Sequence, residues 1–473
     1  GQSEYGLYGI ANSVMGYIGL LNFGIGSAII RYLSLYRARG DREGEEGMAG
    51  LFLKLYGGIA LLILLAGMLV SVHLEGYSRS LSAAEVDKLK ILVRLMTANT
   101  AVFLPFSVFS SLTVVHERYL FNRLINILST VAAPCLNLAM LYGGFASVGL
   151  VAAGTLLNLI SYAAYTIYAV CRLNIRPRFG WRCPGLLREI FVFSAFAFLG
   201  SMVDILYWAT DKLIIGWAVG AAAVTIYNVG ASFNSYVTNL STAISGVLMP
   251  RITSMVTRET PSEEFSDLFI KVGRLQFLVV SFIVSAFVVF GRQFLALWVG
   301  VGYEEAYPVA LLTMLPVTVP LIQNTGLNIL YAMNRHRFRS VVYLIIALLN
   351  VALTFCWVER YGMIGAAAAT CLAYLLGNVL IMNWYYARRI GLDISRFWKN
   401  IGRMCPTVIV FLAAGLWTAD HAALDSWPRF FTGAAIYTLL YLPAAYAFMM
   451  DRYERELCIG VLKKLLRRRK RED

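Results

Sequence analysis

Apolar segments of about 20 residues recur along the whole chain, and this feature limits the fold more than any other. A bilayer holds no water to bond exposed backbone groups, so a spanning segment must be a helix or part of a closed barrel. The strands of a membrane barrel are roughly 10 residues long and alternate in polarity, which these segments do not. Since 59% of the 473 residues are hydrophobic and 14% are charged, the sequence predicts an all-α, polytopic membrane protein.

The pattern predicts thirteen membrane spans. They cover roughly residues 7–30, 49–72, 94–115, 124–143, 147–170, 189–210, 222–249, 270–290, 307–332, 341–357, 362–386, 405–419 and 430–450. The opening residues, GQSEYGLYGI, read like a loop between two spans. We therefore expect that the first native span is missing from the sequence.

Basic residues concentrate in every second loop between these spans and in the C-terminal tail. The intervening loops hold only Arg79, Lys88, Lys90, Lys212, Arg292 and Arg360. Loops rich in lysine and arginine stay in the cytoplasm, so the sequence predicts a cytoplasmic C-terminus. Membrane orientation thus accounts for the formal net charge of +14, and we expect no nucleic-acid partner.

Residues 8–54 and 227–271 form an internal repeat, and each copy has an apolar helix, an arginine, a charged loop and a lysine. Repeats of this kind are typical of transporters with two like halves around a central pathway. The predicted domains are an N-terminal lobe at 1–171 that lacks its first helix, a cytoplasmic linker at 172–188, a C-terminal lobe at 189–388, two additional transmembrane helices at 389–450 and a basic cytoplasmic tail at 451–473.

Three stretches resemble a known family. EYGLYGI with FGIGSAIIRYLSLYRARGD, DKLIIGWAVGAAAVTIYNVG, and NRHRFRS are similar to segments of Wzx-type oligosaccharide flippases of the multidrug/oligosaccharidyl-lipid/polysaccharide exporter superfamily. The resemblance implies two pseudo-symmetric six-helix lobes plus two extra C-terminal helices. It also implies that undecaprenyl-diphosphate-linked oligosaccharides move from the inner to the outer leaflet of the bacterial plasma membrane by alternating access, for surface polysaccharide biosynthesis.

Five basic residues near the predicted cytoplasmic ends of spans are candidates for binding a diphosphate. They are Arg31, Lys54, Arg251, Lys271 and Arg274. Lysine and arginine offset phosphate charge, and arginine does so with two parallel hydrogen bonds. The alternative is that these side chains extend to anionic lipid headgroups. Because Arg31 with Arg251, and Lys54 with Lys271, are repeat equivalents, we expect a basic ring at the inner mouth of the pathway.

The span at 222–249 carries a continuous polar stripe. Its members, at helical spacing on one face, are Asn228, Ser232, Ser235, Asn239 and Thr242. Such a stripe would be costly against lipid, so it predicts contact with sugar hydroxyls in a cavity. Hydrogen bonding to a neighbouring helix is the alternative.

Asp204 and Asp211 lie in or just beyond the span at 189–210. Ionisable residues at such a depth are often functional, so both are candidates for coupling transport to a Na⁺ or H⁺ gradient. The alternatives are a helix–helix hydrogen bond for Asp204 and neutralisation of Asp211 by Lys212. Beyond coupling ions, the sequence indicates no cofactor: its seven cysteines and four histidines show no metal-site or disulfide spacing.

These observations favour a flippase that is not an enzyme. The alternatives are an ion-coupled multidrug or organic-cation exporter of the same fold, or a lipid II flippase. A polytopic polysaccharide polymerase or glycosyltransferase is disfavoured, because the longest outer loop, at about 73–93, is short and has no DxD pattern. Expected partners are lipid-linked oligosaccharide, anionic membrane lipids at the basic tail, and polysaccharide assembly enzymes.

Overall fold

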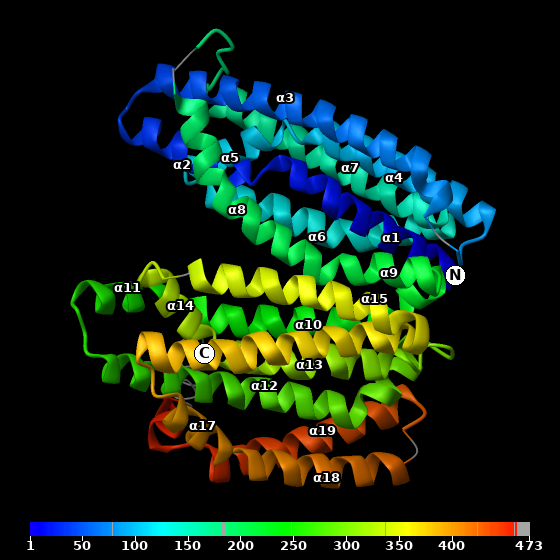
Figure 1. The fold of residues 1–473 in the computed structure, drawn as a ribbon, viewed down its shortest axis with the longest axis vertical. Helices are drawn as coiled ribbons and strands as arrows, with labels where there is room; N and C mark the ends of the chain where they lie inside the picture. Colours follow the sequence, from blue (N-terminus) through cyan, green and yellow to red (C-terminus); the bar gives the residue numbers. More distant parts are fainter. Residues whose placement is uncertain are drawn as a thin grey trace, which may run out of the picture. The chain divides into compact units, whose positions relative to one another are not determined.

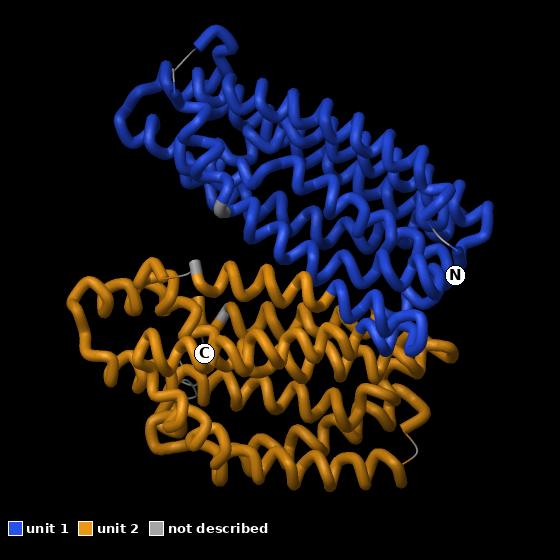
Figure 2. Tube along the Cα trace, viewed as in Figure 1, with its two compact units in different colours: residues 1–228, 351–366 blue, residues 229–350, 367–473 orange. Residues whose placement is uncertain are grey.

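The computed structural model describes residues 1–77, 79–181, 185–246, 248–335, 337–422, 424–457 and 459–460. These residues form helices and connecting turns and contain no strand, so the predicted all-α class is confirmed. The chain divides into two compact units, one of residues 1–228 with 351–366 and the other of residues 229–350 with 367–473 (Figure 2). The basic segment at 461–473, predicted to bind anionic lipid, and residues 182–184 of the predicted linker lie outside the described residues.

The first unit is a bundle of long helices joined by short turns (Figure 1). Its elements are α1 (Gln2–Gly19), η1 (Leu20–Asn22), α2 (Ile25–Ala38), α3 (Arg42–His73), η2 (Leu74–Gly76), α4 (Ala83–Phe103), α5 (Ser107–Val115), α6 (Tyr119–Tyr142), α7 (Ala146–Ile167), η3 (Tyr168–Arg172), α8 (Leu186–Trp208) and α9 (Thr210–Ala218), followed by the start of α10 (Ala221–Gly246).

Local sequence explains where several of these helices begin and bend. Asp41 caps α3 by accepting a hydrogen bond from the Gly44 amide, and Ser82 with Glu85 forms a capping box on α4. α1 and α2 are bent by 40° at their break. Gly24 lies there with a φ of +69°, in the left-handed region that glycine adopts without strain.

The second unit is built around α12, a long and largely buried helix. Its elements after α10 are α11 (Met249–Thr257), α12 (Ser262–Trp298), α13 (Ala306–Ile322), α14 (Asn324–Ala332), α15 (Arg337–Tyr374), η4 (Leu375–Ile381), α16 (Met382–Tyr385), η5 (Tyr386–Ile390), α17 (Ile394–Gly402), α18 (Cys405–His421), α19 (Trp427–Ala444) and η6 (Ala445–Met449). The middle of α15, residues 351–366, belongs to the first unit. α18 and α19, the two helices beyond the predicted repeat, both pack on α12.

Each of the thirteen predicted spans falls on a helix, but length and composition alone identify eight spanning helices among the described residues, or up to eleven if each bent pair is one span. One difference comes from α15, in which two helices meet at a kink where Gly362 has non-helical backbone angles (φ 57°, ψ −142°), so that two predicted spans are counted as one. Another comes from α10, which is not among the counted helices and carries the polar stripe. The exact span number therefore stays a prediction.

The packing boundary between the units differs from the predicted lobe boundary. The repeat places residues 189–228 in the C-terminal lobe, whereas in the structure they belong to the first compact unit. The reason is contact: α8 packs on α2, and α9 packs on α1. The predicted boundaries at 171 and 189 thus describe the sequence repeat rather than the compact units.

Candidate functional site

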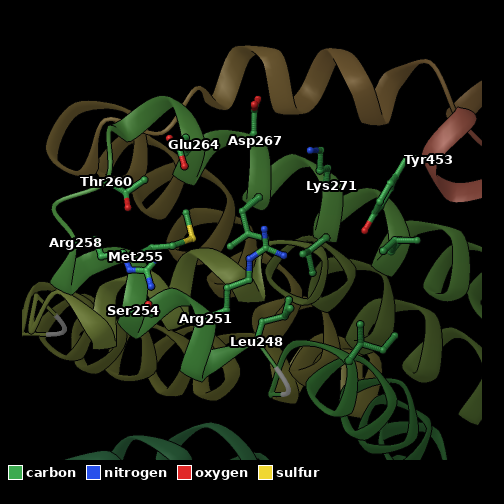
Figure 3. A pocket seen from close by; sticks show the side chains of 14 residues that line it. Leu248, Arg251, Ser254, Met255, Arg258, Thr260, Glu264, Asp267, Lys271 and Tyr453 are labelled. Atoms are coloured by element: carbon green, nitrogen blue, oxygen red, sulfur yellow. The ribbon is translucent and has the colours of Figure 1, made fainter. Parts of the chain in front are cut away.

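A cavity of about 850 Å³ in the second unit brings together basic residues of α11 and α12 (Figure 3). Three cations, Arg251, Arg258 and Lys271, line it together with the carboxylates Glu264 and Asp267. We call this site the cationic cavity. Of the five predicted basic ligands, Arg251 and Lys271 lie in it, and Arg258 was not among the candidates.

Helical spacing explains why these residues meet. Arg251 and Arg258 are seven positions apart on and just after α11, and seven residues equal nearly two helical turns, so both lie on one face. On α12, Glu264, Asp267 and Lys271 follow the same rule at i, i+3 and i+7. The short turn from α11 to α12 makes the two stripes face the same space (Figure 3).

The cavity keeps a positive charge because its cations form no ion pair with a carboxylate of the described residues. In the described part of the chain, no ion pair involves Arg251, Arg258 or Lys271. Asp267 is engaged by Arg396, whose Nη1 lies 2.7 Å from its Oδ1. The Lys271 ammonium lies 5.8 Å from the centre of the Tyr453 ring, a cation–π contact that leaves its hydrogen-bond donors available. An anionic group could therefore bind here without displacing an existing salt bridge.

Arg274 is engaged in a buried ion pair. Its side chain is only 8% exposed and donates two hydrogen bonds of 2.8 Å to the Glu454 carboxylate, which is 2% exposed. The Met449 carbonyl accepts a further bond at 2.9 Å. In this structure the Arg274 guanidinium is buried and neutralised, and it fixes the segment after η6 onto α12. A role for Arg274 in substrate binding stays a prediction.

The equivalent basic pair in the first unit has aromatic and backbone partners. The Arg31 guanidinium lies 4.4 Å from the centre of the Phe193 ring. Lys54 donates a hydrogen bond to the Phe179 carbonyl oxygen. Both side chains are exposed. The predicted ring combines residues of both units and remains a prediction.

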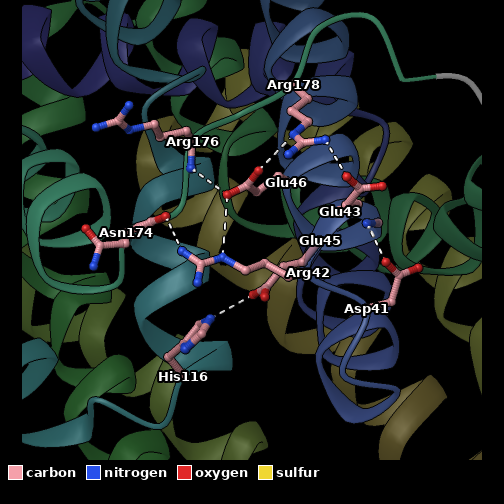
Figure 4. A network of polar contacts seen from close by, with 10 residues as sticks. Asp41, Arg42, Glu43, Glu45, Glu46, His116, Asn174, Arg176 and Arg178 are labelled. Atoms are coloured by element: carbon pink, nitrogen blue, oxygen red, sulfur yellow. Dashed lines mark hydrogen bonds and ion pairs between the residues drawn. The ribbon is translucent and has the colours of Figure 1, made fainter.

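The turn between α2 and α3 carries a polar network that the sequence did not predict (Figure 4). Glu46 accepts a hydrogen bond from Arg178 at 3.0 Å and forms an ion pair with Arg42 at 3.7 Å. Glu45 bonds His116 at 2.7 Å. Hydrogen bonding to Glu43 raises the pKa of Arg178 above its ordinary value. Carboxylates therefore neutralise the basic loop here, unlike in the cationic cavity.

The polar stripe on α10 does not have uniform surroundings. Ser235 and Asn239 are exposed, as is Thr242. Ser232 donates to its own helix, at the Val229 carbonyl. Asn228 packs so closely on α1 that a Cβ added to Gly9 would lie 2.3 Å from its amide nitrogen. Only the part of the stripe around Ser235 and Asn239 is therefore open to a ligand.

The opposite face of α10 is committed to packing. The Ser245 hydroxyl accepts a bond from Asn324 at 2.6 Å, and its carbonyl accepts one from Asn328 at 3.1 Å. Gln276 of α12 donates to the Ser241 carbonyl at 3.2 Å. These bonds satisfy polar groups near the break where α13 and α14 are bent by 50°. The polar side chains of this face therefore form hydrogen bonds between helices.

Asp204 and Asp211 lie in contrasting environments. Asp204, on α8, is exposed, whereas Asp211, at the start of α9, is completely buried. The Asp211 carboxylate accepts hydrogen bonds from Tyr227 at 2.7 Å and Thr354 at 3.1 Å. Groups of three potential metal ligands from histidine, cysteine, aspartate and glutamate are absent from the residues that the structure describes. Asp211 is thus the more enclosed of the two candidate coupling groups.

Comparisons with known proteins agree with this architecture. The chain is 19% identical over 397 residues to a Shigella flexneri protein named "Putative O-antigen transporter", and the match covers 82% of this chain and 91% of that protein. It is 21% identical over 487 residues to the Bacillus subtilis (strain 168) protein named "Uncharacterized membrane protein EpsK", covering 98% of this chain and 92% of that protein.

Two solved structures have a similar fold. One is the lipid II flippase MurJ in an inward closed conformation, with a TM-score of 0.71, 14% identity and coverage of 94% of this chain and 92% of that chain. The other is an inward-facing multidrug resistance transporter of the MATE family, with a TM-score of 0.68, 16% identity and coverage of 84% and 92%. Residues 1–256 match the family described as polysaccharide biosynthesis proteins, and the chain belongs to that family.

Proposed function

We propose that this protein flips undecaprenyl-diphosphate-linked oligosaccharides from the inner to the outer leaflet of the bacterial plasma membrane by alternating access. The observation that carries the proposal is the cationic cavity, which gathers Arg251, Arg258 and Lys271 in a membrane protein of the polysaccharide biosynthesis family. The name of the Shigella relative, an O-antigen transporter, supports the same class of cargo. Such movement makes and breaks no covalent bond, so the protein is not an enzyme.

The charge and polarity of the proposed cargo explain why basic and polar side chains would bind it. A diphosphate carries negative charge that the bilayer centre strongly disfavours, while its lipid tail can remain among the acyl chains. In the proposal, Arg251 and Lys271 bind the diphosphate, and Arg31 and Lys54 are their equivalents in the first half. The exposed hydroxyl and amide groups of Ser235 and Asn239 bond the sugars.

The decisive experiment measures flipping of an undecaprenyl-diphosphate-linked oligosaccharide in liposomes that contain the full-length protein. We expect Arg251→Gln/Lys271→Gln to weaken binding of the lipid-linked oligosaccharide by about tenfold or more, because a loss of about 1.4 kcal/mol changes the equilibrium constant tenfold. Flipping at a low substrate concentration should fall by the same factor. Lys399→Gln/Arg403→Gln is the matched control, since it removes the same charge from α17, outside the cavity. Equal flipping by both variants would reject the cavity as the diphosphate site.

The same assay separates the alternatives. A lipid II flippase would move lipid II faster than the oligosaccharide substrate, and an organic-cation exporter would transport neither lipid. The MATE-family fold is compatible with drug export. The unpaired cations of the cavity argue against a cationic cargo, because like charges repel at short range.

Coupling to a Na⁺ or H⁺ gradient is proposed through Asp211, with the exposed Asp204 as the weaker candidate. Burial beside Tyr227 and Thr354 isolates the Asp211 carboxylate from bulk water, so binding an ion there would change the local charge balance. We expect Asp211→Asn to remove the dependence of flipping on the ion gradient. If flipping still depends on the ion gradient in Asp211→Asn but no longer does so in Asp204→Asn, coupling would be assigned to Asp204 instead.

A further inference from the structure

A second basic cavity, of about 680 Å³, lies in the second unit where α14, α15 and η5 meet. Its lining consists of Arg335, Arg388 and Arg389 with Asn334, Phe338 and Tyr385. We call it the arginine pocket. It shares no lining residue with the cationic cavity, and the proposed transport cycle assigns it no role.

The backbone holds the arginines of this pocket together. Arg335 donates a hydrogen bond of 2.9 Å from Nη1 to the Arg389 carbonyl. That carbonyl belongs to the last turn of η5, which ends where Gly391 adopts a φ of +81°. Carbonyls at a helix C-terminus attract cations, so Arg335 closes the helix end and brings three guanidinium groups to one place.

Two aromatic residues that line the pocket stack on each other. The rings of Phe338 and Tyr385 are stacked, with centroids 4.0 Å apart and planes at 6°. Trp384 lies beside Phe338 at 6.4 Å. The chain turns back at Gly362, so that two arms follow each other. The first arm, residues 337–361 of α15, carries Phe338, and the returning arm, which runs from residue 363 of α15 through η4 and α16, carries Tyr385. The Tyr343–Asn378 hydrogen bond holds the two arms side by side.

Among the residues that the structure describes, the charges of the pocket have no counter-ions. No carboxylate is among its lining residues, and the ion pairs that the structure describes involve neither Arg335 nor Arg388 nor Arg389. Three guanidinium groups repel one another unless an anion neutralises them. A phosphate group suits such a cluster because arginine bonds phosphate oxygens in pairs.

The surface next to the pocket is apolar and indicates the source of that phosphate. Val341 and Ile345, one and two turns beyond Phe338 on α15, are 58% and 59% exposed. On the returning arm, Leu380 is 61% exposed and Trp384 is 53% exposed. Exposed aliphatic side chains leading to an aromatic residue and then to arginines match the profile of a bilayer from acyl chains to headgroups.

We propose that the arginine pocket binds the phosphate headgroup of an anionic phospholipid, whose acyl chains lie along the apolar surfaces of the two arms of α15. The lipid would neutralise the arginines and stabilise the hairpin of α15 beside the stacked Phe338 and Tyr385. The loop charges predict that this end of the unit faces the cytoplasm, so the lipid would come from the inner leaflet. The site is independent of the transported cargo.

Native mass spectrometry of the full chain with added phosphatidylglycerol or phosphatidylcholine tests this proposal. We expect the unchanged protein to retain phosphatidylglycerol in preference to phosphatidylcholine. The affinity for phosphatidylglycerol should fall about fivefold for each arginine removed, first in Arg388→Gln and then in Arg388→Gln/Arg389→Gln. The conservative Arg388→Lys/Arg389→Lys should retain part of the binding. Lys399→Gln/Arg403→Gln, with equal charge loss on and just after α17, should bind like the unchanged protein.

Three outcomes would overturn the proposal. The first is equal retention of both lipids by the unchanged protein. The second is equal loss in the pocket variants and the α17 control, which would indicate general surface charge. The third is displacement of phosphatidylglycerol by millimolar inorganic phosphate, which would indicate a site for free phosphate. Because Arg388→Gln is a single exposed substitution, it remains informative if the double variant fails to fold.

Discussion

Lys271 and Arg274 lie one helical turn apart on α12, yet their surroundings give them opposite roles. Lys271 is exposed in the cationic cavity without an acidic partner, whereas Arg274 is buried against Glu454. The sequence showed both as basic residues near the end of a span. It did not predict the difference, because Glu454 lies 180 residues away along the chain and nothing local links the two.

Breaking the Arg274–Glu454 pair should destabilise the second unit. We expect Glu454→Gln to lower the free energy of unfolding by about 3 kcal/mol, because it removes the close carboxylate partner of a buried guanidinium and leaves only the longer ion pair with Asp451, at 3.5 Å. Arg274→Leu/Glu454→Leu should recover most of that loss, since neither charge then remains. Thermal unfolding in detergent measures both. Glu456→Gln is the control, as its ion pair with Arg452 is exposed and contributes about 1 kcal/mol or less.

The hydrogen bond from Tyr227 to Asp211 should also contribute to stability. Tyr227→Phe removes a buried donor from a carboxylate, and bonds to charged groups contribute about 1.5–3 kcal/mol. Tyr17→Phe removes a partly buried bond to Thr210 and should cost less, about 0.5–1.5 kcal/mol. An equal effect of the two variants on the unfolding midpoint would contradict a larger contribution from the buried Tyr227–Asp211 bond.

At the scale of elements, apolar length and loop chemistry were sufficient to place the helices, but not their bends. Each predicted span falls on a helix because the bilayer leaves few alternatives. The bends depend on single positions with a positive φ, such as Gly24 and Gly362. At Gly24 the backbone also packs closely against α8, a tertiary contact that the local sequence does not contain. Likewise, the repeat correctly predicted that Arg251 and Lys271 lie on adjacent helices. It gave no reason to select Arg258, which the sequence showed only as one of the basic residues of a loop, although it lines the same cavity.

The break between α1 and α2 should not tolerate a side chain at Gly24. A Cβ there would lie 2.7 Å from the Ser194 carbonyl oxygen, on a backbone with a φ of +69°. Left-handed backbone alone costs a non-glycine residue about 1–2 kcal/mol, so Gly24→Ala should destabilise by about 2 kcal/mol or more. Gly26→Ala, whose Cβ would have ordinary contacts, should leave the unfolding midpoint unchanged or slightly raised.

At the scale of the whole molecule, the alternating loop charges predict which end of the bundle faces the cytoplasm. Val301, in the turn after α12, is 94% exposed and is predicted to lie outside, whereas the exposed Lys399 of α17 is predicted to lie inside. In a variant without the seven native cysteines, Val301→Cys should react with an impermeant maleimide in intact cells. Lys399→Cys should react only after permeabilisation, and the reverse result would invert the topology.

The buried pair of Arg274 and Glu454 also has a consequence for biosynthesis. Translation proceeds from the N-terminus, so α12 enters the membrane long before Glu454 has been synthesised. Until then, Arg274 lacks the carboxylate that neutralises it, and the second unit retains an uncompensated charge on α12, its main helix. Only a chain translated past Glu454 can remove that charge. Prematurely terminated chains would therefore stay less stable and be preferred targets for membrane proteases.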